Sequence, residues 1–412
     1  MSSSMNVRMS VFNRELKKSS SLYILVVSCI CVLLMVIPYD TNVQNVVTRA
    51  EIEDTNNVCP PCEQIVPAVP SLKPPGRRRE LMGDDEDSQS PKRQLMLLTM
   101  GRSGSTYTSA IISNNPKVFY VAEPLHRLPD GIKIYGKTAV ETNAWDIAKN
   151  MMTSFLTCNI GALDPEIFES YMYGNSRSTR AMYFCLRNRT ASSYKHVKCV
   201  LSAWNTCLAS EMTFIKTIRL RVQYAEWYLE EFPNLKLLFL VRDPRAVLYS
   251  QSKAFGNFNI DNGTAQIAES HCNKLRRDIA AFKLLSDKYP GRMKAFRYED
   301  GALNPMDYAE SLFNFTQLEF NEMSKTFVQK ITSGYANNEK SNAPFGFMKK
   351  DSTATMNKWR HSALMTTVTA IDRKCADVYA ELGYKTIHSE SELRSSSSLT
   401  TVLKSGGIFT DL

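Results

Sequence analysis

The pattern of apolar and polar residues divides this chain into regions of different character. Residues 22–39 form an uncharged apolar run, and residues 40–93 hold many Pro, Asn, Asp and Glu residues with little apolar periodicity. From Gln94 onward, short apolar runs typical of buried strands alternate with helical patterns. This alternation predicts a single α/β domain, 94–386, with a central, mostly parallel sheet flanked by helices.

Five runs in this domain predict strands, and one long pattern predicts a helix that packs on the sheet. The strands are expected at 94–100, 117–123, 213–220, 235–241 and 293–299, and the helix at 265–289. The segment 124–210 is less regular, so we expect loops and short helices there. The tail 387–412 is rich in serine and is expected to be disordered.

The apolar run is long enough, at about 18 residues, to cross a thin bilayer. Four basic residues and one acid precede it, whereas acids dominate just after it. The positive-inside rule then makes 1–21 a cytosolic tail, 22–39 a signal-anchor and 40–93 an extended, mostly disordered stem. The rest of this single-pass type II membrane protein would lie in the lumen. The alternative is a cleaved signal peptide.

The cysteines fit an oxidising compartment. Eight of the ten follow the apolar run, which is an even number, although their pairing cannot be read from the sequence. Cys59 and Cys62 lie in the stem, where a disulfide between chains would give a homodimer. The net charge of +9 favours an acidic partner. For a lumenal protein we expect that partner to be an anionic glycan, with no nucleic acid.

The stretch Gly101-Arg102-Ser103-Gly104-Ser105-Thr106-Tyr107 lies between an expected strand and an expected helix. Small residues there allow a tight turn, while hydroxyls and backbone N–H groups at a helix N-terminus bind anions. A nucleotide kinase would place a lysine at the helix entry to contact β and γ phosphates. Ser105 stands there instead, which favours a monophosphate or a phosphosulfate.

A second motif follows the expected strand 235–241. Asp243 is expected to cap the next helix and Pro244 to occupy its first turn. Arg242 would then point from the carboxyl edge of the sheet into the crevice where α/β sheets bind ligands, with Ser250 two turns further on. The alternative for this motif alone is an Arg–Asp ion pair at a helix start.

Together these motifs resemble those of sulfotransferases that use 3'-phosphoadenosine 5'-phosphosulfate (PAPS), and in particular the Golgi carbohydrate 6-O-sulfotransferases of the chondroitin, keratan and N-acetylglucosamine branch. The resemblance covers about 94–386 and matches poorly over 126–210. It rests on GRSGST (101–106), VAEPL (121–125), IKTIRLR (215–221), LVRDPRAVLYS (240–250), FRYEDGALNP (296–305), WRHS (359–362) and CADVYAELGY (375–384).

The resemblance implies roles for individual residues. Arg102 to Tyr107 would hold the 5'-phosphosulfate, and Arg242 and Ser250 the 3'-phosphate. Arg102 would also stabilise the leaving group. It further implies a nucleotide-kinase-like fold, a Golgi membrane location, a glycan acceptor and no metal requirement.

Sulfuryl transfer needs a base for the proton of the acceptor hydroxyl. Glu123 is our first candidate and His126 our second. The alternative for Glu123 is an internal ion pair, and for His126 a loop histidine with a satisfied hydrogen bond. Strand alternation places Lys216 and Arg219 on opposite faces, so both are not expected at one site. Glu299 is expected to cap a helix.

Two other functions remain open on the sequence. A protein-tyrosine sulfotransferase would share the loop and the Arg-Asp motif but would act on acidic peptides. A catalytically inactive, membrane-anchored glycan-binding protein would keep the fold without the reaction.

Overall fold

The computed structural model describes residues 92–127, 142–163, 165–187, 193–255, 259–260, 262–332, 351–401 and 408–409. All of them belong to one unit, Glu86–Leu412. The predicted cytosolic tail, the signal-anchor 22–39, nearly all of the stem and Cys59 and Cys62 lie outside these residues. Among the residues that the structure describes, no helix is long and apolar enough to cross a membrane.

A five-stranded sheet with the order β2-β3-β1-β4-β5 forms the centre of the unit. Its four strand pairs are parallel, which confirms the predicted α/β architecture. The strands are β1 (Arg93–Thr99), β2 (Val118–Ala122), β3 (Met212–Thr217), β4 (Leu235–Val241) and β5 (Met293–Arg297). Because all strands are parallel, their carboxyl ends meet at one edge, where the predicted anion loops begin.

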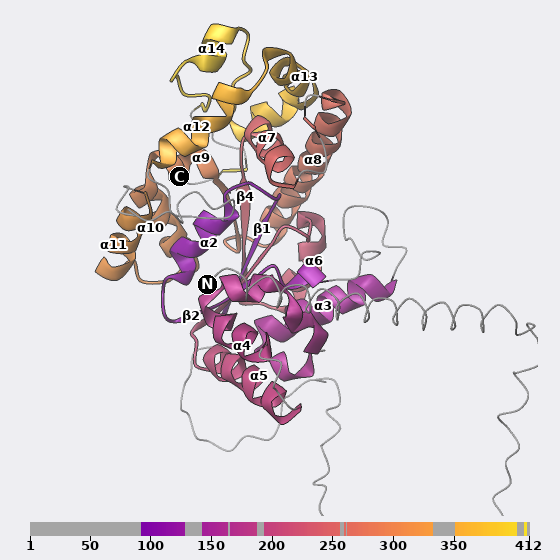
Figure 1. The fold of residues 1–412 in the computed structure, drawn as a ribbon, viewed down its shortest axis with the longest axis vertical. Coiled ribbons are helices and arrows are strands. Elements are labelled where there is room, and N and C mark those ends of the chain that lie inside the picture. Colours follow the sequence, from indigo (N-terminus) through magenta and orange to yellow (C-terminus); the bar gives the residue numbers. More distant parts are fainter. Residues whose placement is uncertain are drawn as a thin grey trace, which may run out of the picture. The chain divides into compact units, whose positions relative to one another are not determined.

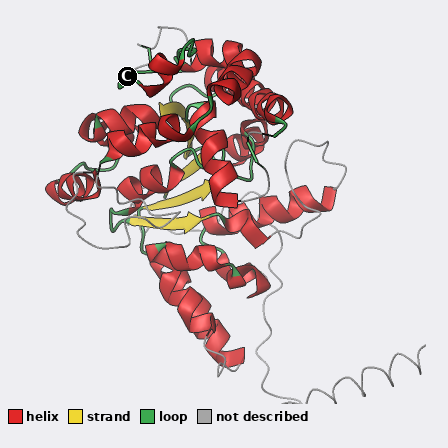
Figure 2. Ribbon diagram, turned by 45° about the horizontal axis from the view of Figure 1, so that its top comes forward, coloured by secondary structure: helices red, strands yellow, loops and turns green. Residues whose placement is uncertain are grey.

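Helices cover both faces of the sheet (Figures 1 and 2). The α-helices are α2 (Ser105–Ser113), α3 (Thr142–Leu156), α4 (Arg177–Arg187), α5 (Ser193–Leu208), α6 (Ala225–Glu231), α7 (Pro244–Phe255), α8 (Thr264–Lys288), α9 (Tyr298–Leu303), α10 (Pro305–Thr316), α11 (Glu322–Thr332), α12 (Ser352–Ser362), α13 (Met365–Leu382) and α14 (Glu390–Arg394). Short 3₁₀ helices are η2 (Pro124–Arg127), η3 (Ile160–Ala162), η4 (Pro165–Glu169), η5 (Tyr171–Asn175) and η6 (Val222–Tyr224).

Alternating residues of the strands supply two cores. Met96 and Leu98 of β1 face a core shared with α3, α6 and α8. Leu95 and Leu97 face the opposite core, shared with α2 and α10. The period-two pattern therefore decides which helices each strand residue meets. The predicted helix 265–289 is confirmed as α8 with a shift of one residue.

Strand β3 ends three residues before the prediction, at Thr217. The backbone N–H of Ile218 donates to the carboxylate of Glu123 rather than continuing the ladder. A buried carboxylate needs hydrogen-bond donors. Glu123 therefore takes the N–H of Ile218, which would otherwise be available to extend β3. The residues after Thr217 consequently do not follow strand alternation.

The segment 124–210 contains more helix than we predicted. Helix α3 has 15 residues and α5 has 16. Disulfides Cys158–Cys207 and Cys185–Cys199 close this region, and Cys272–Cys375 links α8 to α13. The sequence could not reveal that these cross-links hold several amphipathic helices together at the β2 edge.

The prediction of a disordered tail from residue 387 is wrong as far as Thr401. Helix α14 lies there, and Leu393 is fully buried. The guanidinium of Arg360, itself buried, donates to the carbonyls of Glu392, Leu393 and Ser397. A low-hydrophobicity segment is ordered here because one arginine satisfies several of its backbone acceptors.

Candidate functional site

The first anion loop joins β1 to α2 as predicted. Arg102 and Gly104 both have positive φ, at 73° and 87°. The N–H groups of Tyr107 and Thr108 donate to the carbonyl of Gly104, which closes the first helical turn. Because the first N–H groups of a helix lack partners within it, those of Ser105 and Thr106 are left to bind an anion.

Gly104 allows a close approach of an aromatic ring to this loop. A Cβ atom at Gly104 would overlap the ring of Tyr298, and its φ of 87° disfavours other residues. We therefore expect Gly104→Ala to shift the loop and to weaken anion binding there by at least about tenfold. The resemblance found in the sequence makes 3'-phosphoadenosine 5'-phosphate (PAP) the anion with which to titrate this loss. Gly291→Ala is the matched control, since Gly291 also has positive φ but has open space around it.

The two predicted anion motifs meet at the carboxyl edge of the sheet. The Nε of Arg102 donates to Ser250 Oγ at 3.0 Å, and Arg242 Nη1 donates to the carbonyl of Arg102 at 3.0 Å. The side-chain amide of Gln251 donates to the carbonyl of Gly101 at 2.9 Å. The sequence did not single out Gln251, whose role emerges only because β1 and β4 are neighbours. Both loops are thus fixed to each other.

Two guanidinium groups crowd this junction. Burial, followed by the charge of Arg242, lowers the pKa of Arg102. The guanidinium of Arg242 lies over the ring of Tyr298, 4.5 Å from its centroid, and its Nε is buried without a hydrogen-bond partner among the described residues. An orphaned buried donor beside a second cation suits an anionic ligand with several oxygens.

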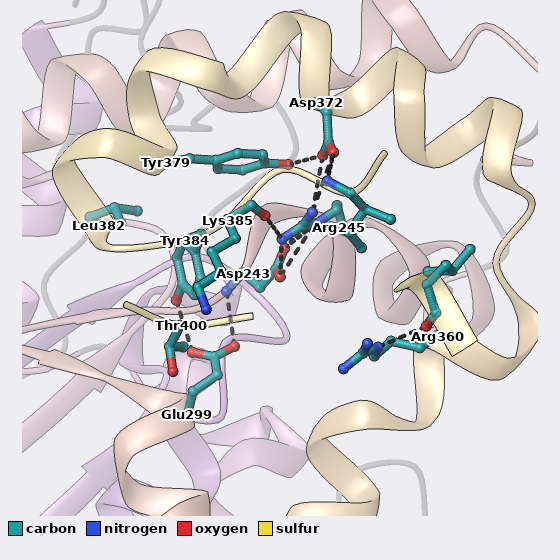
Figure 3. Close-up of polar contacts among 12 residues, drawn as sticks. Asp243, Arg245, Glu299, Arg360, Asp372, Tyr379, Leu382, Tyr384, Lys385 and Thr400 are labelled. Carbon is teal, nitrogen blue, oxygen red and sulfur yellow. Dashed lines mark hydrogen bonds and ion pairs between the residues drawn. The ribbon is translucent and has the colours of Figure 1, made fainter. Parts of the chain in front are cut away.

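A network of buried polar side chains holds the loop between β4 and α7 in place (Figure 3). Asp243 accepts from the backbone N–H of Arg245 at 2.9 Å, which confirms its predicted capping role at the start of α7. Its carboxylate also pairs with the guanidinium of Arg245 at 2.9 Å. Arg245 is fully buried, and its guanidinium also donates to the carboxylate of Asp372 and to the carbonyl of Lys385. The ion pair therefore anchors α7 on α13.

The prediction that Glu299 caps a helix is wrong. Its carboxylate accepts from the backbone N–H of Asp243 at 3.1 Å and from the hydroxyl of Tyr384 at 2.8 Å (Figure 3). Burial raises the pKa of Glu299, although the charge of Arg242 opposes this. Glu299 thus holds the peptide that follows Arg242 and links it to the C-terminal segment.

We expect Glu299→Ala to lower the affinity for PAP about tenfold, because the N–H of Asp243 loses its acceptor and Arg242 loses its orientation. Glu299→Gln keeps an acceptor oxygen and should restore most of the affinity. Tyr228→Phe, which removes a buried hydroxyl elsewhere, controls for general loss of stability. Equal PAP affinity in Glu299→Ala and wild type would contradict this role.

Glu123 lies directly after β2 with a φ of 52° and is almost fully buried. Lys216 Nζ contacts its carboxylate at 2.8 Å and Arg219 Nη1 at 2.6 Å. Burial by itself would raise the pKa of Glu123, but the charges of Lys216 and Arg219 outweigh it and lower the pKa. The ion pair that we considered as an alternative is present.

Lys216 and Arg219 reach the same carboxylate, contrary to our prediction from strand alternation. Arg219 lies beyond the end of β3 at Thr217, where the chain turns. Its backbone N–H donates to Thr217 Oγ1 at 3.0 Å, so the turn redirects its side chain. The structure therefore joins one carboxylate and two cations at the ends of β2 and β3.

His126 lies in η2, three residues after Glu123. Its Nδ1 is 3.0 Å from Ser170 Oγ, and its ring contacts that of Tyr171 edge to face at 5.0 Å. The backbone N–H of His126 donates to the carbonyl of Glu123 at 3.0 Å. The structure therefore connects the two candidate bases through the main chain.

The sequence profile of the "Sulfotransferase family" matches residues 94–322, from β1 to the start of α11. Similar proteins include carbohydrate sulfotransferase 5 of Mus musculus, which is 24% identical over 73% of this chain and 82% of its own length. Carbohydrate sulfotransferase 3 of Mus musculus is 23% identical over 81% of this chain and 77% of its own length. Carbohydrate sulfotransferase 1 of Homo sapiens is 26% identical over 75% of this chain and 83% of its own length.

Two solved sulfotransferase structures align with 70% of this chain. The sulfotransferase domain of the Synechococcus PCC 7002 olefin synthase has a TM-score of 0.38 at 17% identity, over 70% of this chain and 96% of that domain. Mouse sulfotransferase SULT7A1, solved with PAP, has a TM-score of 0.35 at 9% identity, over 70% of this chain and 85% of that protein.

Proposed function

Because this chain belongs to the sulfotransferase family, we propose that it transfers a sulfuryl group from PAPS to a hydroxyl group of a sugar. The observation that carries this proposal is the junction of Arg102, Arg242 and Ser250, which brings two anion-binding loops together. PAPS carries a phosphosulfate and a separate 3'-phosphate, so it needs two such loops on one ligand.

The residues divide between the two ends of the donor. Arg102, Ser103, Gly104, Ser105, Thr106 and Tyr107 would hold the 5'-phosphosulfate through the N-terminus of α2. Arg242 and Ser250 would hold the 3'-phosphate, and the Nε of Arg242, which has no hydrogen-bond partner among the described residues, would supply a donor for it. PAPS supplies the sulfuryl group, whose sulfur bonds to the acceptor oxygen as its bond to the phosphate oxygen breaks.

The residues of the chain contribute charge and a proton acceptor. Arg102 would stabilise negative charge on the departing phosphate. Glu123 would accept the proton of the attacking hydroxyl, since its lowered pKa keeps it ionised. Lys216, Arg219 and the backbone N–H of Ile218 all donate to this carboxylate, so some of these hydrogen bonds must weaken before it takes the proton. His126 is the second candidate for the base.

The relatives and the sequence support a proposal for the acceptor and the location. The relatives named above are carbohydrate sulfotransferases, which supports a glycan acceptor of the chondroitin, keratan or N-acetylglucosamine type. We propose the 6-hydroxyl as the site of transfer. We also propose that 22–39 anchors the enzyme in the Golgi membrane, with the catalytic unit in the lumen and a dimer formed through the stem.

The test is transfer by the full chain from PAPS labelled with radioactive sulfate. The acceptors are desulfated chondroitin, desulfated keratan, glycans that end in N-acetylglucosamine, and an acidic tyrosine peptide. We expect label on a glycan, located at its 6-hydroxyl. Label on the peptide alone would assign the chain to protein-tyrosine sulfotransfer, and PAP binding without transfer to any acceptor would favour the inactive glycan-binding protein.

A further inference from the structure

Three aromatic side chains and a lysine form a half-buried cluster between α3 and α6, outside the loops described above. The rings of Trp145 and Tyr224 are 5.3 Å apart between centroids. Lys149 Nζ lies 5.7 Å from the centroid of Trp145 and 5.2 Å from that of Trp227. Figure 1 shows α3 and α6 side by side.

The Trp145 end of this cluster lies at the carboxyl edge of the sheet. The carbonyl of Leu156, the last residue of α3, accepts from Gln94 and Thr213, which lie near the starts of β1 and β3. Helix α3 covers the same sheet face as α6, and Trp145 precedes Leu156 by eleven residues, or about 16 Å. Helix α3 therefore runs from the carboxyl edge, at Trp145, to the opposite edge.

Tyr224 reaches the same place from β3. The chain leaves β3 at Thr217, passes Arg219 beside Glu123, and enters η6, which ends at Tyr224. The backbone N–H of Tyr224 donates to the carbonyl of Arg221 at 3.0 Å. Along the chain, Tyr224 thus follows Arg219, which contacts the candidate base, by five residues.

One cation lies directly beside these rings. Lys149 pairs with Asp146 at 2.8 Å and retains 23% exposure of its side chain. The guanidinium of Arg221, which precedes η6, pairs with the buried carboxylate of Asp278, so its charge is balanced within the protein.

We propose that Trp145 and Tyr224 form a platform on which a sugar ring of the acceptor stacks, with Lys149 attracting a carboxylate or sulfate group on that glycan. This inference rests on the proposed function and deepens it. The apolar C–H face of a sugar packs on aromatic rings, and the lysine favours an acidic over a neutral chain.

Trp145 and Lys149 lie in the segment 126–210, where we expected a poor match to the carbohydrate sulfotransferase motifs, and Tyr224 follows the motif 215–221. A specificity determinant is expected in such a segment, because acceptors differ while the donor stays the same.

Trp227 offers a matched control within the cluster. It is also half-buried and also contacts Lys149, but it lies one turn further along α6 and packs against Phe232. It is therefore further from the carboxyl edge than Tyr224. Loss of either tryptophan removes similar packing, and only Trp145 is expected to touch the acceptor.

The experiment measures kcat and KM of the full chain with an anionic glycan and with the same glycan after carboxyl reduction and desulfation. PAP affinity, measured in parallel, reports on the donor site. We expect Trp145→Ala to raise the KM for the anionic glycan about tenfold, with PAP affinity unchanged. Trp227→Ala should leave this KM within about twofold of wild type.

The charge of the platform is tested by Lys149→Gln. This change should reduce the preference for the anionic over the neutral glycan by about threefold to tenfold, without loss of PAP affinity. The variant also decides the matter if Trp145→Ala fails to fold. An unchanged preference in Lys149→Gln, or equal KM values for Trp145→Ala and Trp227→Ala, would overturn the platform. Absence of transfer by wild type to any glycan would instead refute the proposed function, and the platform with it.

Discussion

Arg242→Ala is expected to abolish measurable donor binding while the protein stays folded. Arg242 is half-buried, rests on the ring of Tyr298 and keeps one donor without a partner among the described residues. A charge-assisted, bidentate contact to phosphate is among the strong hydrogen bonds, so its loss should weaken PAP binding by about a hundredfold or more. Calorimetric titration with PAP, with thermal unfolding measured alongside, checks both parts of this expectation.

Two further variants sharpen this test. Arg242→Lys keeps the charge but not the planar fork, and should recover only part of the affinity. Lys253→Ala lies on the same helix, where Lys253 Nζ donates to Ser362 at 3.0 Å, and should bind PAP as wild type does. Wild-type PAP affinity in Arg242→Ala would remove this residue from the 3'-phosphate site.

Glu123→Gln should bind PAP normally yet transfer slowly. If Glu123 is the base, its replacement should lower kcat by about a hundredfold to ten-thousandfold, the usual contribution of general base catalysis. Glutamine keeps the shape and accepts from the N–H of Ile218, but it leaves Lys216 and Arg219 without their carboxylate. The variant is therefore also expected to unfold at a lower temperature.

The pH dependence separates catalysis from this structural effect. The pKa of Glu123 is lowered below its ordinary value of 4.5, so its carboxylate stays charged throughout the neutral range. If Glu123 is the base, kcat/KM for the acceptor should fall only below about pH 4.5. An acid limb near pH 6.5, the ordinary pKa of histidine, would instead favour His126.

The lowered pKa of Glu123 also makes the stability of the protein depend on pH. A carboxylate whose folded pKa is lower than its unfolded pKa stabilises the protein above the unfolded value. This stabilisation is lost as the pH falls through the folded pKa. Arg219→Met removes one cation from Glu123 and should raise its pKa, moving both the stability loss and the acid limb of activity to higher pH. An acid limb that does not move would separate the observed base from Glu123.

Much of the candidate donor site could be predicted from the sequence because its signals are local. The strand 235–241 was predicted with its observed limits, and Asp243 caps the next helix as its position after a strand suggested. The loop 101–107 opens α2 because glycine and small hydroxyl residues allow that turn. Such features depend on neighbours within a few residues, which a single sequence contains.

Other features could not be predicted because they depend on contacts between distant residues. Gln251 reaches Gly101 only because β4 lies beside β1, and Arg219 reaches Glu123 only because β3 stops at Thr217. The segment after residue 387 is ordered because Arg360 binds its carbonyls, although its composition indicates disorder. The sequence by itself determined that five strands form a parallel sheet, where α2 and α7 begin, and which residue types suit an anion. Only the tertiary structure decided which of them share a site, because burial and pairing of charges are set by the packing of the whole sheet.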